Sequence, residues 1–292
     1  MAVQVLVSVD GTVCDPELAL LAADDLAAVR GDGVFETLLV IGGVAREAEP
    51  HLARLARSAA MLDLPEPELD RWRACIGTVI ERWRSDDDFA LRLVLSRGRE
   101  GGDSVTGYAT ASPVSDTVLE QRANGIAVLS MDRGVSSDAA QRAPWLLLGA
   151  KTLSYAVNMA AMRHANRAGA DDVIFTSTDD YVLEGPTSTV VLATGRTLRT
   201  PPAAVGILPG TTQQALFRVA ERAGWNCEVA PVRPAELMGA DAVWLASSVR
   251  LLSHVHTLDG QSLGDATRGA ELTHELQQLL ARKPVADRVS RA

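Results

Sequence analysis

The chain has 292 residues, of which 47% are hydrophobic and 22% are charged, and its formal net charge is -9 at pH 7. This is the composition of a globular protein with room for two domains, and its negative charge argues against nucleic acid or an anionic membrane as main partner. With three scattered cysteines, no apolar run of roughly 18 residues and no basic region before its first apolar stretch, the chain is expected to be soluble and cytoplasmic.

The first half of the chain alternates predicted strands with predicted helices. A hairpin is expected over 33–45, with its turn at Gly42-Gly43. Two amphipathic helices follow it, and the first has Pro50 near its first turn. The helices are predicted over 50–62 and 70–83, and further strands over 3–11, 89–98 and 123–131.

In the second half, a helix is expected over about 150–168, with Lys151 near its start. Strands over 171–178 and 181–185 are expected to form a hairpin. The remaining predicted elements are strands over 188–194 and 241–247, a helix over 211–225 and a closing helix over 271–283.

These elements predict a mixed α/β fold. Tight hairpins make antiparallel neighbours, so two α/β lobes fit better than one doubly wound parallel sheet. We expect a small N-terminal domain over 1–120, a connection over 121–136, a larger C-terminal domain with a hairpin-rich sheet over 137–282, and a flexible tail over 283–292.

Lys151 is one of only two lysines among 28 basic side chains, and the other, Lys283, lies in the polar tail. Arginine stays protonated, whereas a desolvated lysine amine can lose its proton and attack a carbonyl carbon. A leftover surface lysine is the alternative. The apolar run WLLLG before Lys151 favours a reactive amine in an apolar recess.

Two further features are candidate binding groups. Glu184 ends a predicted strand, where its carboxylate either faces solvent in a turn or holds a cationic ring nitrogen. The segment GILPGTTQQ leads into a helix whose first free amides, near Thr211 and Thr212, can bind an anion, although most such helix starts bind water. His254 and His256 share a predicted strand face, but no third ligand accompanies them, so we expect no metal site.

Seven segments in this order resemble those of the fold-type IV pyridoxal-phosphate enzymes: RGDGVFET (30–37), PHLARL (50–55), LRLVLSRG (91–98), Lys151, LEGPTST (183–189), ILPGTTQ (207–213) and LASSVR (245–250). This family holds branched-chain aminotransferases, D-amino-acid transaminases and 4-amino-4-deoxychorismate lyases. The resemblance covers about residues 5–265, nearly the whole chain. It implies a two-domain enzyme that uses pyridoxal 5′-phosphate and forms a homodimer.

The resemblance also implies roles for individual residues. Lys151 would bind the cofactor aldehyde as a Schiff base, and Glu184 would pair with the pyridine nitrogen, so that the ring accepts electron density. Arg54 would contact the phosphate, although the sequence alone favours an ordinary exposed helix arginine. The rest of the phosphate cup would come from Thr211, Thr212 and Ser247 or Ser248.

The chain departs from many relatives at three positions. Thr189 stands where an asparagine is common, Gln213 where an arginine is common, and Phe35 where the aminotransferases often have tyrosine. The side chains expected to contact substrate are Phe35, Arg97, Tyr108 and Arg250, with Arg30 and Arg99 as further candidates for the substrate carboxylate. Arg250 is favoured because it follows the phosphate serines, as in lyase-like relatives.

The loop SRGREGGDSVTGY resembles that of the aminodeoxychorismate lyases, in which Ser-Arg-Gly leads through glycines to Gly-Tyr. The expected reaction is therefore the conversion of 4-amino-4-deoxychorismate to 4-aminobenzoate and pyruvate, a step toward folate. The alternative is an aminotransferase of D-amino or branched-chain amino acids, either alone or as a second activity. A cofactor-binding protein without turnover is disfavoured, because both Lys151 and Glu184 are present and storage needs no electron sink.

Overall fold

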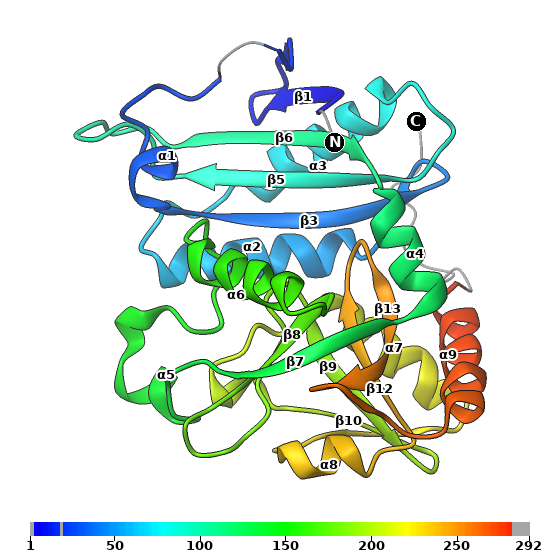
Figure 1. The fold of residues 1–292 in the computed structure, drawn as a ribbon. Coiled ribbons are helices and arrows are strands. Elements are labelled where there is room, and N and C mark those ends of the chain that lie inside the picture. Colours follow the sequence, from blue (N-terminus) through cyan, green and yellow to red (C-terminus); the bar gives the residue numbers. More distant parts are fainter. Residues whose placement is uncertain (1–2, 18–19, 282–292) are drawn as a thin grey trace. The chain divides into compact units, whose positions relative to one another are not determined.

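The computed structural model describes residues 3–17 and 20–281 (Figure 1). The predicted tail over 283–292, with Lys283, lies outside them. Their contacts divide the chain into two compact units. The first holds the described residues up to Ser115 together with Ala150–Tyr155, and the second holds Asp116–Gly149 and the described residues from Ala156 onward. The short segment that carries Lys151 therefore belongs with the first unit.

The first unit is built on a six-stranded sheet in which every neighbouring pair is antiparallel. The predicted hairpin over 33–45 is confirmed, and the long neighbouring strands are held by eight-residue registers. In the order β2-β1-β6-β5-β3-β4, the strands are Val13–Cys14, Val5–Ser8, Thr106–Pro113, Phe89–Ser96, Gly33–Ile41 and Val44–Ala45.

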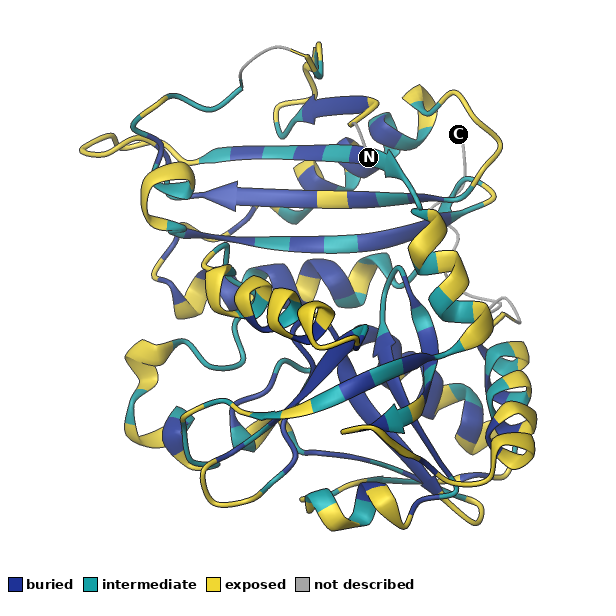
Figure 2. Ribbon diagram, viewed as in Figure 1, coloured by how far each residue is buried: buried dark blue, intermediate teal, exposed yellow. Residues whose placement is uncertain are grey.

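Two amphipathic helices cover one face of this sheet. Helix α2 (Ala48–Met61) packs against β3, and α3 (Leu69–Arg82) packs against β1 and β6. Both confirm the predicted helices. A shorter helix, α1 (Leu26–Arg30), is capped at its start by the Asp25 side chain, which accepts a hydrogen bond from the Ala27 amide. Buried and partly exposed residues alternate along β6, as a sheet with one covered face requires (Figure 2).

The second unit contains a mixed sheet. Its centre is antiparallel, whereas β10–β11, β13–β7 and β7–β8 are parallel pairs. In the order β11-β10-β9-β12-β13-β7-β8, the strands are Asn226–Val229, Thr197–Thr200, Thr189–Thr194, Ala242–Ser247, Leu251–Leu258, Ile126–Asp132 and Asp172–Thr176, and β14 (Gln261–Ser262) pairs with β13.

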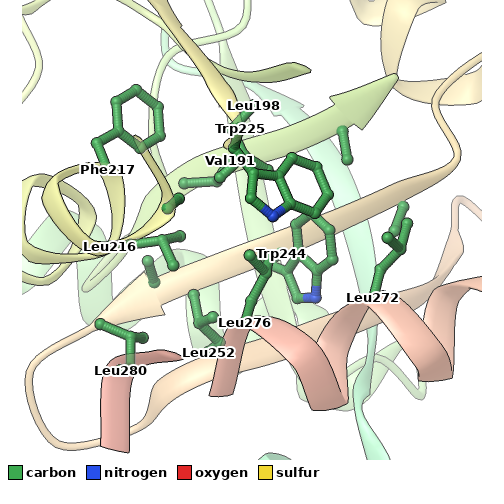
Figure 3. Close-up of a cluster of buried hydrophobic side chains, with 14 of the residues drawn as sticks. Val191, Leu198, Leu216, Phe217, Trp225, Trp244, Leu252, Leu272, Leu276 and Leu280 are labelled. Atoms are coloured by element: carbon green, nitrogen blue, oxygen red, sulfur yellow. The ribbon is translucent and has the colours of Figure 1, made fainter. Parts of the chain in front are cut away.

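A hydrophobic core lies between this sheet and helices α7 (Thr211–Arg222) and α9 (Ala266–Ala281). Trp244 of β12 is fully buried beside leucines of both helices (Figure 3). Its indole Nε1 donates to Thr273 Oγ1 at 2.8 Å, so the only polar atom of the ring is satisfied. The other helices of this unit are α4 (Asp116–Asn124), α5 (Ala139–Arg142), α6 (Ala156–Arg167) and α8 (Pro234–Met238), with short 3-10 turns at Pro144–Leu146 and Ala203–Val205.

Two predicted elements differ from the structure. The helix expected over 150–168 begins only at Ala156, so Lys151 is not helical. The strand expected over 181–185 is reduced to an isolated bridge between Thr176 and Val182, with backbone hydrogen bonds to β8. Tertiary pairing decides the first case, because residues 151–153 take their hydrogen bonds from β3 and Ser58. Residues 181–184 keep the predicted pairing with β8. Among the described residues, no helix is both long and apolar enough to cross a bilayer.

Candidate functional site

Lys151 lies in an extended segment that pairs with the beginning of β3. The Phe35 amide donates to the Lys151 carbonyl at 3.0 Å, and the Leu153 amide donates to the Gly33 carbonyl at 2.8 Å. The Lys151 amide in turn donates to Ser58 Oγ on α2 at 3.1 Å. The backbone at Lys151 is therefore fixed by a strand and by a helix of the first unit.

The glycines of RGDGVFET allow this close pairing. Gly31 has φ of +67°, and a Cβ atom there would lie 2.7 Å from Ser154 Oγ. A Cβ at Gly33 would lie 2.6 Å from the Leu95 carbonyl oxygen and 2.7 Å from Leu153 Cδ1. Such distances are too short for real atoms, so only glycine admits the segment of Lys151 here. The motif has a structural function beyond a turn before a strand.

Aromatic rings surround the Lys151 amine. Its Nζ lies 4.4 Å from the centre of the Phe35 ring and 5.7 Å from that of Tyr155. The two rings meet edge to face, with their centres 5.2 Å apart. An ammonium group is attracted to the face of such rings. Lys151 is partly buried, which favours a reactive amine over a leftover surface lysine. Tyr155 was not predicted as a site residue.

Arg54 lies on the buried face of α2, where it is only 5% exposed. Its Nε donates to Glu36 Oε1 at 2.7 Å and its Nη2 donates to Glu36 Oε2 at 2.8 Å. His51 Nδ1 lies 2.7 Å from the same Oε2. The alternative of an ordinary exposed helix arginine is therefore wrong, because Arg54 belongs to a buried ionic cluster.

The charges within this cluster follow from its geometry. Burial raises the pKa of Glu36, but the charge and hydrogen bonds of Arg54, with the hydrogen bond of His51, outweigh burial and lower that pKa to about 2. Burial lowers the pKa of His51, and the charges of Arg54 and Lys151 add to this effect. His51 is therefore neutral at pH 7. Because a carboxylate only accepts, His51 donates to Glu36 through Nδ1–H.

In the second unit, Glu184 is a partly buried acceptor with both oxygens engaged. Arg133 Nη1 donates to its Oε1 at 3.0 Å, and the Leu208 amide donates to its Oε2 at 3.0 Å. Only 14% of the Glu184 side chain is exposed, so it is not a solvated turn residue. Arg133, which the sequence reasoning missed, also lies 5.6 Å from the centre of the Phe175 ring. Leu208 belongs to the segment that enters α7.

The start of α7 is buried and has no side-chain cap. Gly210 is its N-cap, and Thr211 and Thr212 are both buried. Thr211 Oγ1 lies 3.4 Å from Ser248 Oγ, so two members of the predicted phosphate cup meet. Ser247 precedes Ser248 as the last residue of β12. The amides of a helix start, with hydroxyls beside them, form an anion-binding arrangement.

Thr189, one of the departures from the family pattern, packs against this helix start. A Cβ atom at Gly210 would lie 2.3 Å from Thr189 Oγ1. Gly210 can approach β9 this closely only because it has no side chain. The space that a side chain would fill is taken by Thr189. Gln213, the second departure, is buried in the first turn of α7.

Three of the four arginines predicted as candidates for the substrate carboxylate lie in the first unit, where two form ion pairs and one is exposed. Arg97 pairs with Asp32 at 2.7 Å and donates to the Leu62 carbonyl, and Arg99 pairs with Asp24 at 2.8 Å. These contacts hold loops of the first unit together. Arg30 is exposed and donates to the neighbouring Val29 carbonyl.

Arg250, the favoured candidate, is buried in the second unit and pairs with the buried Asp172 at 2.6 Å. Its Nη1 also lies 3.3 Å from Gln121 Oε1 on α4. This buried ion pair favours a structural role for Arg250 over contact with a substrate. The turn that carries Ser248 is held in addition by Arg122, which donates to the Val249 carbonyl.

Arg92, a residue that the sequence reasoning missed, is an exposed cation on β5. Its guanidinium carbon lies 5.8 Å from the centre of the Phe35 ring. Burial raises the pKa of Tyr108, and the charge of Arg92 opposes that rise. Among the described residues, Arg92 has no acidic partner within ion-pair distance. In FALRLVLS, successive side chains point to opposite faces of the sheet, so Arg92 lies on the other face from its leucine neighbours. This alternation is the signal that could have identified Arg92.

Phe35, Tyr108 and Arg92 lie on one face of the first sheet. Phe35 and Tyr108 both stand opposite Val94 of β5, and Arg92 lies two residues from Val94. The sheet thus brings the predicted substrate residues Phe35 and Tyr108 to one face, and the Phe35 ring is also the one that contacts Lys151. No group of three metal-binding side chains occurs in the part of the chain that the structure describes.

Known proteins are similar to this chain in sequence and fold. The amino-transferase class IV family matches residues 33–258. The bifunctional aminodeoxychorismate lyase / D-amino acid transaminase of Mycobacterium tuberculosis is 52% identical over 267 residues, which are 88% of this chain and 92% of that protein. A hypothetical aminotransferase from M. tuberculosis, solved in its PLP-bound form, has a TM-score of 0.92 at 51% identity, covering 95% of this chain and 99% of that one. A fold IV transaminase from Curtobacterium pusillum has a TM-score of 0.90 at 42% identity, covering 96% and 99%.

Proposed function

Because the chain belongs to the class IV aminotransferase family, we propose that it is a pyridoxal 5′-phosphate enzyme that cleaves 4-amino-4-deoxychorismate to 4-aminobenzoate and pyruvate. We further propose that it transfers the amino group of D-amino acids as a second activity. The observation that carries the proposal is the Lys151 amine, which is held 4.4 Å from the Phe35 ring centre by a backbone fixed on both sides.

The residues present fit the cofactor. In the first unit, Lys151 supplies an amine for its aldehyde, and Arg54 supplies guanidinium donors for its phosphate. In the second unit, Glu184 supplies a carboxylate for the ring nitrogen, and the buried, uncapped start of α7 supplies amides for the phosphate, with Thr211 and Ser248 beside it. When bound, the cofactor stabilises negative charge that develops on the carbon next to the substrate nitrogen.

Lys151 is the residue that moves protons. In its neutral form, Nζ would remove the proton from the amine-bearing carbon of the substrate and would later return it, in the lyase reaction to the departing enolate and in the transaminase reaction to a different carbon. Phe35 and Tyr155 limit where the amine can lie. The destination of that proton distinguishes the two activities. One lysine can therefore serve both activities, and the M. tuberculosis relative is named as bifunctional.

Substrate carboxylate binding is proposed for Arg92 in place of Arg97 or Arg250. Arg92 is exposed, lacks an acidic partner among the described residues and lies on the sheet face of Phe35 and Tyr108. A planar guanidinium suits a carboxylate, because it can donate two parallel hydrogen bonds. Both 4-amino-4-deoxychorismate and amino acids carry carboxylates, so one arginine serves either substrate.

The test of the lyase activity needs no keto acid. Purified protein loaded with pyridoxal 5′-phosphate is mixed with 4-amino-4-deoxychorismate alone, and 4-aminobenzoate and pyruvate are measured. We expect equal amounts of the two products over many turnovers. If neither forms while D-alanine and 2-oxoglutarate exchange amino groups, the protein is an aminotransferase only.

We also propose that the protein is a cytoplasmic homodimer. Trp145 is 75% exposed and is followed by the exposed Leu146 in a short 3-10 turn. A large exposed aromatic side chain beside a leucine is typical of an interface. Cys14, Cys75 and Cys227 are all free thiols, which suits a reducing compartment. Light scattering should give twice the chain mass of 31.0 kDa.

A further inference from the structure

Asp25 is a buried carboxylate to which the proposed reaction assigns no role. It is only 1% exposed, and burial raises its pKa, but hydrogen bonds outweigh burial and lower that pKa below its ordinary value. Asp25 is therefore charged at pH 7. Its bond with the Ala27 amide, at 2.9 Å, caps α1. A serine would cap the helix without a buried charge, so the carboxylate has to be explained by its other contacts.

The other hydrogen bonds of Asp25 come from both ends of the loop between β5 and β6. Ser96, the last residue of β5, donates its hydroxyl to Oδ1 at 2.5 Å. Thr106, the first residue of β6, donates its hydroxyl to Oδ2 at 2.8 Å. The Ser96 hydroxyl in turn accepts the Gly98 amide at 3.0 Å. One carboxylate therefore joins the two ends of the loop over 97–105, which offsets part of the entropy lost when the loop closes.

The ends of this loop border the sheet face that carries Phe35 and Tyr108. Ser96 and Thr106 stand opposite each other, and the next pair on the same face is Val94 with Tyr108. Tyr108 therefore follows Thr106 by two residues on the same strand and points to the same side of the sheet. A contact that fixes Thr106 also fixes the part of β6 from which Tyr108 projects.

The charge of Asp25 acts on Tyr108 as well. Burial raises the pKa of Tyr108, the charge of Arg92 opposes that rise, and the charge of Asp25 adds to it. A charge affects a neighbouring pKa in this way over a short distance. Asp25 is thus coupled to Tyr108 both through the strand and through space.

We propose that Asp25 is a positioning residue for substrate binding. It holds the start of β6 against the end of β5, and it thereby sets the position of Tyr108 on the face where Arg92 is proposed to bind the substrate carboxylate. This inference rests on the proposed function and on contact between Tyr108 and the substrate. Its consequence is specific, because loss of Asp25 weakens substrate binding and leaves cofactor binding unchanged.

The experiment separates KM from kcat in Asp25→Ala. Protein loaded with pyridoxal 5′-phosphate is assayed at steady state with 4-amino-4-deoxychorismate. We expect KM to rise about tenfold, because two hydrogen bonds at the loop ends are lost, while kcat and the affinity for the cofactor change less than about twofold. General destabilisation would instead lower the amount of active enzyme, and with it the apparent kcat, at an unchanged KM.

A double-mutant cycle tests whether the effect passes through Tyr108. Tyr108→Phe should raise KM, and adding Asp25→Ala to it should raise KM by less than a further factor of about two, because both changes act on one contact. If the two increases multiply in full, or if either single variant keeps the parent KM, the inference is wrong although the proposed function stands. If the parent releases no 4-aminobenzoate, the proposed lyase function is wrong and the inference with it.

Trypsin reports on the loop itself. Arg99 lies within the loop, and 67% of its side chain is exposed. Cleavage after Arg99 requires local opening of the loop, so it should be about tenfold faster in Asp25→Ala than in the parent. Equal cleavage rates would show that Asp25 does not hold the loop ends, which contradicts the proposal.

Asp87→Ala is the matched control. Asp87 accepts the Ser85 hydroxyl at 2.7 Å in an exposed turn before β5, so its loss should leave KM and cleavage within about twofold of the parent. Circular dichroism establishes whether Asp25→Ala folds. Should it not fold, Thr106→Val takes its place, because it removes one bond to Asp25 and keeps the cap of α1. Its KM should rise about threefold, and a KM at the parent value would overturn the proposal.

Discussion

Phe35 contacts Lys151 in two ways. Its amide donates to the Lys151 carbonyl at 3.0 Å, and the centre of its ring lies 4.4 Å from the Lys151 amine. One strand residue therefore sets both the backbone position of the lysine and the region that its amine occupies. This relationship depends on the glycines before Phe35, because they allow the lysine segment to pair with β3.

Gly33→Ala should displace the lysine segment. The new methyl group would overlap the Leu95 carbonyl oxygen and the Leu153 side chain. The strand that carries Leu95 and the segment that carries Leu153 cannot move apart without breaking their hydrogen bonds to β3. We expect a loss of unfolding free energy of about 2 kcal/mol or more, with lower activity per folded molecule. Gly77→Ala, in the interior of α3 with no atom near its Cβ, is the matched control. Denaturant unfolding should show it unchanged or stabilised by up to about 1 kcal/mol.

Arg92→Ala should weaken substrate binding without unfolding the protein. Its guanidinium is exposed, so little packing is lost, and the proposed contact with the substrate carboxylate disappears. We expect KM for 4-amino-4-deoxychorismate to rise by roughly 10- to 100-fold, with a similar rise for D-alanine. Steady-state kinetics of Arg30→Ala, an equally exposed arginine, provides the control. Equal KM values for the parent and Arg92→Ala would contradict the assignment.

Asp172→Asn should destabilise the second unit without affecting substrate affinity. The change leaves the buried Arg250 guanidinium without its ionic partner, which typically costs about 3–5 kcal/mol. Thermal unfolding should show a clear fall in Tm, while KM of the folded fraction stays at the parent value. A raised KM at unchanged stability would instead return Arg250 to the substrate site, where the sequence had placed it.

Acid should unfold the protein partly through Glu36. Its pKa is about 2 in the folded chain against an ordinary value of 4.5, so the stabilisation is fully present above pH 4.5 and is lost as the pH falls through 2. The difference corresponds to roughly 3 kcal/mol. Urea unfolding between pH 6 and 2 should therefore show a smaller loss of stability for Glu36→Gln than for the parent. Parallel pH profiles of the two proteins would contradict this role.

Local patterns predicted much of the fold. The hairpin over 33–45 and the helix that begins at Thr211 follow from Gly42-Gly43 and from Pro209-Gly210 before an amphipathic run. The helix near Lys151 was predicted too early, because residues 151–153 take their hydrogen bonds from β3 and Ser58. Pairing with a strand more than a hundred residues away leaves no mark in the local sequence pattern.

The candidate site was predictable by residue type but not by partner. Motif resemblance identified Lys151, Glu184 and Thr211, and the structure explains the position of each within its own unit. The side chains that hold Glu184 and Arg54, which are Arg133 and Glu36 respectively, carry no signal of their own, because a charged residue in or beside a strand is ordinarily exposed. Their function became visible only through their partners, 51 and 18 residues away.

The most direct measurement is peptide mapping after borohydride reduction of the cofactor-loaded protein. Reduction fixes the cofactor to the amine that binds it, so the parent should carry the added mass on the peptide that contains Lys151 and on no other. Lys151→Ala should carry none, and its lyase and transaminase rates should fall by about a thousandfold or more. A Lys151→Ala protein that still takes up the label, or that turns over substrate at the parent rate, would contradict the account.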